Sequence, residues 1–171
     1  MDPRRLILAG LGALLLAGCA GYRLGPVGGQ VAGARDIQVP MARNSTLEPR
    51  LVEPVTEALR RHIQQDGTFR LETDGAPADL VLETTLVSYE RLPMAFQRKD
   101  VVTVSEYELR LSCRVVLRER GAERPILDRI VSGRAAILVG PDQTSAERQA
   151  APLLADDLAR RAVILVSEGA W

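Results

Sequence analysis

Histidine, cysteine and lysine are scarce in this sequence of 171 residues, which contains one histidine, two cysteines and a single lysine, Lys99. So few histidines and cysteines leave little material for a metal site or for catalysis by a histidine base. The sequence also lacks the G-x-S-x-G, Walker, H-E-x-x-H and C-x-x-C motifs of common enzyme and metal sites. We therefore expect a protein that is not an enzyme and that has no cofactor or metal.

Neither sign of charge is in excess, because 22 Lys and Arg residues balance 22 Asp and Glu residues. A nucleic-acid-binding protein normally has a basic excess, so this balance argues against nucleic acid as a partner. Aromatic residues make up only 4% of the chain, but 46% is hydrophobic and 26% is charged. Such a composition is typical of a globular protein rather than a disordered one.

The N-terminal segment has the pattern of an export signal. Arg4 and Arg5 precede an apolar run from Leu6 to Ala17. Twelve helical residues rise only about 18 Å, whereas the hydrocarbon core of a bilayer is roughly 30 Å thick, so this run is too short for a permanent span. A basic start, a short apolar stretch and then small residues are typical of a secretory signal peptide.

The end of this segment, Leu16-Ala17-Gly18-Cys19, resembles the lipobox of bacterial lipoproteins. The resemblance implies a lipoprotein signal peptide over residues 1–18 and lipid attachment to Cys19. An ordinary signal peptide followed by a chance cysteine is the alternative. Several acyl chains on one cysteine hold a protein on a membrane without a transmembrane helix. Because Ala20 rather than Asp follows the cysteine, the sorting rule of these lipoproteins implies the outer membrane, facing the periplasm.

Hydrophobic periodicity organises the rest of the chain. We expect residues 19–35, which are rich in glycine, to form a lipidated tether, and residues 36–171 to form a single domain. The spacing predicts strands over residues 36–42, 69–72, 79–91, 101–120 and 126–137, and helices over residues 49–66 and 144–168. This order predicts an α+β fold, a two-layer sandwich of a mixed, mostly antiparallel sheet with two helices packed on one face. The first two strands flank a helix and are expected to be parallel through a right-handed crossover.

Five residues outside the termini carry specific expectations. Thr144-x-x-Glu147 is a capping-box signature at the start of the last helix, and Pro152 is expected to kink that helix or to move its start later. His62 lies beside the apolar stripe of the first helix, so we interpret it as a boundary histidine. Cys113 falls on the apolar face of the longest strand, where we expect a small hydrophobic residue without a redox role.

Short motifs along the mature chain resemble the LPS-assembly lipoprotein family LptE. After the lipobox come Gly21-Tyr22-Arg23-Leu24, Ile37-Gln38-Val39-Pro40, Asn44-Ser45-Thr46, Glu48-Pro49, Val55-Thr56-Glu57-Ala58-Leu59 and Ala78-Asp79-Leu80-Val81-Leu82. The resemblance implies a non-catalytic outer-membrane lipoprotein that binds lipopolysaccharide. It also implies a role as partner and plug of the outer-membrane β-barrel LptD, in a pair that inserts lipopolysaccharide into the outer leaflet.

The segment Arg91–Asp100, expected to be a loop, alternates cations with apolar side chains. Lipid A carries phosphates on an apolar body, and arginine binds phosphate through paired, charge-assisted hydrogen bonds. Arg98 and Lys99 lie where the loop of the family has basic residues, and Arg129 lies roughly where the family has another. We therefore interpret Arg91, Arg98, Lys99 and Arg129 as lipopolysaccharide-binding residues. The same side chains also fit the solvated ends of a hairpin, and that alternative stays open.

A function from a different class fits the same composition. A periplasm-facing lipoprotein that docks on and activates a cell-wall synthase would share the anchor and the small α+β domain. A hydrolase with an unrecognised site is disfavoured, because the sequence shows no pairing of a nucleophile with a base. Co-purification distinguishes the barrel-partner function from the synthase-activator function, because the first predicts a large barrel and the second a wall synthase.

Overall fold

The computed structural model describes residues 32–97, 100–138 and 142–169. The expected signal peptide, Cys19 and most of the expected tether lie outside these residues, as do Arg98 and Lys99. The strands are β1 (Asp36–Gln38), β2 (Arg43–Asn44), β3 (Arg70–Glu72), β4 (Leu80–Gln97), β5 (Asp100–Glu119) and β6 (Leu127–Leu138). The helices are α2 (Val52–Asp66), which follows the 3-10 turn η2 (Pro49–Leu51), and α3 (Gln143–Ser167).

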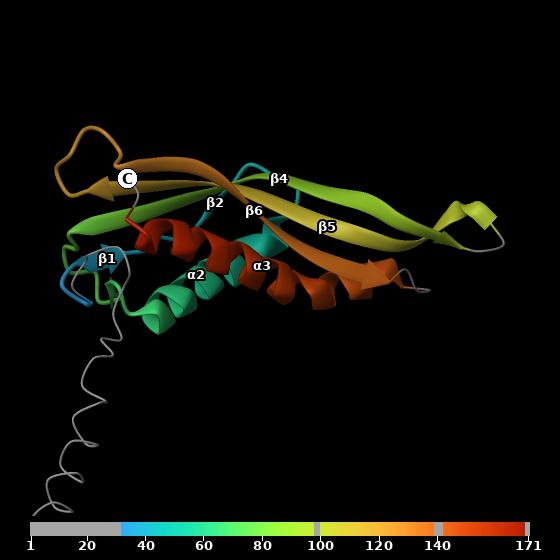
Figure 1. The fold of residues 1–171 in the computed structure, drawn as a ribbon, viewed down its shortest axis with the longest axis horizontal. Helices are drawn as coiled ribbons and strands as arrows, with labels where there is room; N and C mark the ends of the chain where they lie inside the picture. Colours follow the sequence, from blue (N-terminus) through green and yellow to red (C-terminus); the bar gives the residue numbers. More distant parts are fainter. Residues whose placement is uncertain (1–31, 98–99, 139–141, 170–171) are drawn as a thin grey trace, which may run out of the picture.

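A mixed sheet forms one layer of the molecule, and α2 and α3 form the other (Figure 1). The strand order is β3-β1-β4-β5-β6, and β2 also pairs with β4. β1 is parallel to both β3 and β4, whereas the long β4–β5 and β5–β6 pairs are antiparallel. The α+β prediction is therefore confirmed, including the helices on one face and the parallel arrangement of the two strands around α2.

The predicted strand over residues 36–42 is confirmed only over Asp36–Gln38, because the chain leaves the sheet between β1 and β2. The backbone in this gap bonds to α2 instead of to a strand. The carbonyl oxygen of Val39 accepts from Arg60 Nε at 3.1 Å and from Arg60 Nη2 at 2.8 Å. The backbone N–H of Ala42 donates to Thr56 Oγ1 at 3.0 Å. These side chains satisfy backbone groups that the sheet would otherwise pair.

The hydrophobic core lies between the sheet and the two helices. The predicted apolar face of β5 is confirmed, since its residues from the middle to the end of the strand are almost fully buried: Leu109, Leu111, Cys113, Val115 and Leu117. The helices add Val55, Leu59, Ile63, Leu154, Leu158 and Val166. Burying each large side chain of this kind contributes roughly 1.5–3 kcal/mol. Burial also raises the pKa of the Cys113 thiol to about 12, which keeps it in the unreactive protonated form.

α3 lies so close to β6 that one strand position has no room for a side chain. A Cβ atom added to Gly133 would lie 2.6 Å from the backbone nitrogen of Leu158. At the next residue of β6, the backbone N–H of Arg134 donates to Asp157 Oδ2 of α3 at 3.0 Å. The helix therefore packs directly on the backbone of the edge strand.

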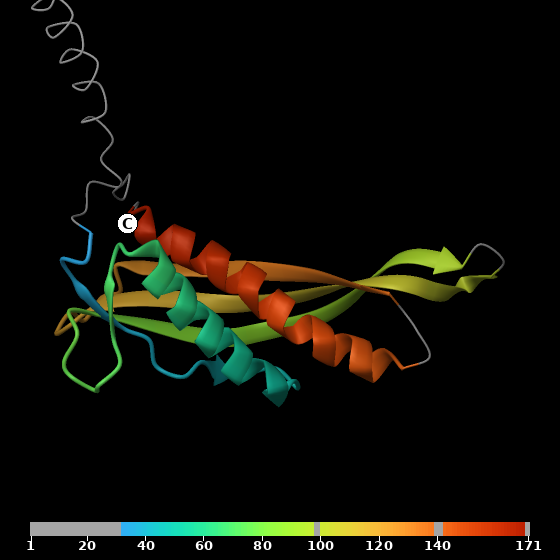
Figure 2. The same ribbon diagram turned by 90° about the horizontal axis from the view of Figure 1, so that it is seen from below.

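The start of α3 differs from its prediction. Asp142, not Thr144, is the N-cap, since its Oδ1 accepts from the backbone N–H of Ser145 at 3.0 Å. Glu147 does not complete a capping box, because it is buried and bonds elsewhere. Pro152 does not move the start of the helix either, and α3 continues through it (Figure 2).

The expected loop Arg91–Asp100 is largely strand, and this is the main correction to the fold. β4 continues to Gln97 and β5 begins at Asp100, so the two strands form one long hairpin. β6 pairs with β5 only as far as Glu106, which leaves a two-stranded ribbon beyond the helices (Figures 1 and 2). Pro93 lies where the register shifts, and an irregular pairing tolerates its missing N–H.

Candidate functional site

The hairpin ribbon presents large apolar side chains to solvent. Met94 is 60% exposed and Phe96 is 50% exposed, both near the end of β4. A two-stranded ribbon has no core beneath it, so these side chains have little protein to cover them. Arg98 and Lys99 follow in the sequence and lie outside the described residues. Exposed apolar groups next to basic residues in the chain suit an amphiphilic anion.

Arg91 lies on the helix-covered face of β4, where it joins two carboxylates. Its Nε donates to Glu147 Oε1 at 2.7 Å, and its Nη2 donates to Glu147 Oε2 at 2.8 Å. Nη2 also lies 3.2 Å from Glu48 Oε1, and the guanidinium carbon is 5.0 Å from the centre of the Tyr89 ring. Arg91 thus connects β4 with α3 and with the turn before η2.

Burial explains why this arginine is needed. The Glu147 side chain is only 8% exposed, and a buried carboxylate is costly unless it is paired. The Arg91 hydrogen bonds lower the pKa of Glu147 and raise the pKa of Arg91. Burial, followed by the Glu147 charge, raises the pKa of Tyr89 to about 12. All three groups keep their ordinary charge states at neutral pH, and a phosphate at Arg91 would compete with Glu147 and Glu48.

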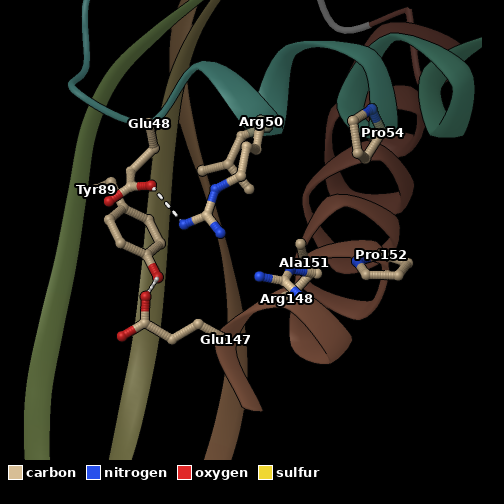
Figure 3. Close-up of a pocket in the computed structure, with 9 residues that line it drawn as sticks. Glu48, Arg50, Pro54, Tyr89, Glu147, Arg148, Ala151 and Pro152 are labelled. Atoms are coloured by element: carbon tan, nitrogen blue, oxygen red, sulfur yellow. Dashed lines mark hydrogen bonds and ion pairs between the residues drawn. The ribbon is translucent and has the colours of Figure 1, made fainter. Parts of the chain in front are cut away.

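A pocket of about 230 Å³ lies beside this cluster, between η2, β4 and the first half of α3 (Figure 3). Within it, Arg50 Nη2 donates to Glu48 Oε2 at 3.1 Å, and Tyr89 Oη donates to Glu147 Oε2 at 3.4 Å. The pocket combines an apolar interior with charged groups at its border. It is lined by Glu48, Arg50, Leu51, Pro54, Tyr89, Glu147, Arg148, Ala151 and Pro152.

The structure does not bring Arg129 to the other predicted ligand residues. Arg129 is exposed on β6 and pairs in register with Val115 of β5. Val115 lies fifteen residues from Asp100 along β5, which at about 3.3 Å per residue is roughly 50 Å. Arg91 pairs with Leu109, nine residues from Asp100, or roughly 30 Å from that end of the hairpin. Arg91 and Arg129 therefore lie at separate places along the sheet, and both are far from Asp100 at the start of β5.

Sequence reasoning missed Glu147 as a site residue, although its spacing held a signal. Ala150, Leu154 and Leu158 form the buried stripe of α3, and Glu147 lies on the same stripe at helical spacing. A carboxylate on a buried stripe requires a partner, so the position alone predicts an arginine or lysine opposite. His62 was interpreted correctly as a boundary residue: its side chain is 17% exposed, and its Nε2 lies 3.0 Å from an oxygen of Asp156 on α3.

Two features are absent from the part of the chain that the structure describes. No group of three or more His, Cys, Asp or Glu side chains there is arranged to hold a metal ion. In the same residues, no helix combines the length and the apolar character needed to cross a membrane.

Comparison with solved structures shows related folds at low sequence identity. A Xanthomonas campestris protein is 10% identical with a TM-score of 0.63, and the alignment covers 86% of this chain and 92% of that one. A hypothetical protein of Chlamydia trachomatis is 13% identical with a TM-score of 0.54, over 77% of this chain and 95% of that one. A Caulobacter crescentus protein described as a lipoprotein is 15% identical with a TM-score of 0.53, over 79% and 89%.

The sequence has no match among curated proteins. A family model for lipopolysaccharide assembly, LptE, does match residues 34–164. This match extends from just before β1 almost to the end of α3, and so includes both layers of the fold. The chain therefore belongs to the LptE family of lipopolysaccharide-assembly proteins.

Proposed function

We propose that this protein is the non-catalytic lipoprotein partner and plug of an LptD-like outer-membrane β-barrel, with which it binds lipopolysaccharide and assists its assembly. The family match over residues 34–164 carries this proposal. It includes the long hairpin as well as the two-layer body.

The helix-free face of the sheet supports the role of a plug. Large outer-membrane barrels have a polar interior, so a protein that fits inside one needs a surface of charged and hydrogen-bonding groups. Arg114 Nε donates to Asp128 Oδ1 at 2.7 Å across β5 and β6, and the Ser112 and Ser132 hydroxyls lie 2.8 Å apart. This face is covered by paired polar groups rather than by a large apolar patch.

The hairpin ribbon supports the binding of lipopolysaccharide. In this proposal, Arg98 and Lys99 bind phosphate groups of lipid A, and Met94 and Phe96 contact its apolar part. Arg91 and Arg129 remain proposed ligand residues, but each would meet a different part of the ligand or a second molecule. Arg91 and Arg129 lie roughly 30 Å and 50 Å along β5 from Asp100, which supports separate contacts rather than a single headgroup site.

The chain that follows the proposed lipid anchor joins the folded body far from the ribbon. The chain reaches the body beside β3, where the backbone N–H of Gly33 donates to the carbonyl oxygen of Thr68 at 3.0 Å. Figure 2 shows β1 and the ribbon at opposite ends of the sheet. A lipid on Cys19 would therefore hold one end at the periplasmic surface of the outer membrane and leave the ribbon at the other.

Purification from detergent-solubilised outer membranes tests the proposal. The full-length chain with a C-terminal tag is expected to bring down a large barrel protein in near-equal amount, together with lipopolysaccharide. A Cys19→Ser variant is the control for the anchor and should be lost from the membrane fraction. Recovery of a cell-wall synthase in place of the barrel would contradict the proposal and support the alternative function.

A further inference from the structure

We propose that the pocket beside Arg91 is a docking site for a protein partner and receives an apolar side chain that lies next to a carboxylate in the partner. We call it the Arg148 pocket, with the lining residues given above. The inference rests on the proposed function, under which that partner is the barrel protein. Four observations support this occupant: the pocket's size, its charge, its border and the proline in its wall.

The size of the pocket favours a side chain over a free small molecule. Its volume of about 230 Å³ is below the roughly 300–1,000 Å³ of typical small-molecule sites. Leu51, Pro54, Ala151 and Pro152 supply its apolar surface. A single apolar side chain inserted from a partner would fill such a space, as the central residues of protein interfaces do.

The charges around the pocket favour a partner that carries a carboxylate. Arg91 pairs with both acids, Glu147 and Glu48, and Arg50 pairs with Glu48 as well. Arg148 makes no ion pair within 4 Å among the described residues, and Asp142 acts on it only over a longer distance. Three arginines therefore face two carboxylates, which leaves a positive border.

Two of the most exposed leucines are sequence neighbours of residues that line the pocket. Leu47 is 98% exposed and precedes Glu48 in the chain. Leu153 is 66% exposed and follows Pro152. An apolar pocket with exposed apolar residues and arginine around it has the composition of an interface centre.

Pro152 gives an independent argument. A proline inside a helix removes the N–H that would bond to the carbonyl oxygen four residues earlier, here that of Arg148. Pro152 is exposed, so packing in the core does not explain its presence. It does line the pocket, next to Ala151 and Arg148 (Figure 3). Pro152 therefore donates no hydrogen bond to the carbonyl oxygen of Arg148.

Substitutions at exposed positions test the inference without disturbing the core. The full-length lipidated chain is purified from outer membranes as wild type, as Leu47→Ser with Leu153→Ser, as Arg148→Glu, and as Ile164→Ser. Ile164 is 45% exposed near the C-terminal end of α3, outside both the pocket lining and the helix-free face, and is the matched control. We expect about tenfold less barrel protein with the first two variants and no loss with the control. Thermal unfolding of each variant checks that the fold is retained.

A photo-crosslinking amino acid at position 47 identifies the occupant. The expected product joins this position to a segment of the barrel protein in which an apolar residue neighbours Asp or Glu. Adducts only with a second copy of this chain or with lipid would overturn the inference, as would wild-type recovery of the barrel by both pocket variants. In either case a barrel that still purifies with the wild type leaves the proposed function standing. If the wild type recovers no barrel, the proposed function fails, and absence of any protein adduct at position 47 then overturns the docking site as well.

Discussion

At the scale of single residues, two arginines show how burial changes the contribution of an ion pair to stability. Arg91 and Arg114 each bind a carboxylate with two nitrogens. The partner of Arg91 is Glu147, with a side chain 8% exposed, whereas Asp128, the partner of Arg114, is 36% exposed. Water replaces the partner easily in the second pair but not in the first.

We predict that Arg91→Gln lowers the free energy of unfolding by about 2 kcal/mol, because it leaves the Glu147 carboxylate buried without a cation. The matched variant Arg114→Gln removes an exposed pair and should cause no measurable loss. Urea unfolding of the two variants and the wild type at pH 7 gives the comparison. Equal losses in both variants would contradict the assigned difference in burial.

The Arg91–Glu147 pair makes the free energy of unfolding depend on pH. In the folded state the pKa of Glu147 lies below its ordinary value of 4.5. The charged pair therefore stabilises the folded state above pH 4.5, and this contribution is lost as the pH falls through the lowered folded pKa. The stability difference between wild type and Arg91→Gln should therefore be full at pH 7 and shrink below about pH 4. A difference that stayed constant down to pH 2 would show that the charge of Glu147 is not its source.

Only part of this residue-level picture was predictable. The burial of Cys113 followed from strict alternation along one strand, which is local information. The role of Arg91 depends on Glu147, fifty-six residues later in the chain, and on the path that α3 takes across the sheet. Spacing alone therefore gave Arg91 a ligand role and did not reveal its carboxylate partners.

At the scale of elements, the contact between α3 and β6 depends on one glycine. Gly133→Ala should lower the free energy of unfolding by about 1–3 kcal/mol, because the new methyl group meets the backbone of α3 rather than a movable side chain. Ala136→Val is the matched control, since it adds more volume to an exposed position of the same strand. Thermal unfolding measures both, and a neutral Gly133→Ala would show that α3 stands farther from the sheet.

Elements with a buried face were predicted well, and elements without one were not. α2, α3 and the main parts of β4, β5 and β6 each carry an apolar stripe, which sets the period of the sequence. The ribbon beyond Glu106 has no core beneath it, so its residues carry no such period. Its regular structure comes from backbone pairing between β4 and β5, which the local sequence does not reveal.

At the scale of the whole molecule, the length of the hairpin separates two tests of lipopolysaccharide binding. Arg98→Glu with Lys99→Glu changes the end of the ribbon, and Arg129→Glu changes a position roughly 50 Å away. If the ribbon end holds the phosphates, the double variant should weaken binding of purified lipopolysaccharide about tenfold or more, and Arg129→Glu should change it little. Circular dichroism confirms that the fold is intact in each.

The outcomes of this comparison are distinct. A loss with Arg129→Glu alone would move the site to the β5–β6 end of the sheet. Unchanged binding in a variant that combines all three substitutions would reject the basic residues as ligands and leave them as solvated parts of a hairpin.

The hydrogen bond between Asp157 and the backbone of Arg134 affects how readily the protein can aggregate through its edge strand. β6 is an edge strand, because only β5 pairs with it in the sheet. An edge strand of this length has unpaired backbone groups to which a strand of another molecule can add. Because Asp157 occupies an amide in the middle of that strand, an incoming chain meets a carboxylate where it needs a free donor. Asp157 therefore hinders the addition of a strand from a second molecule at this edge of the sheet.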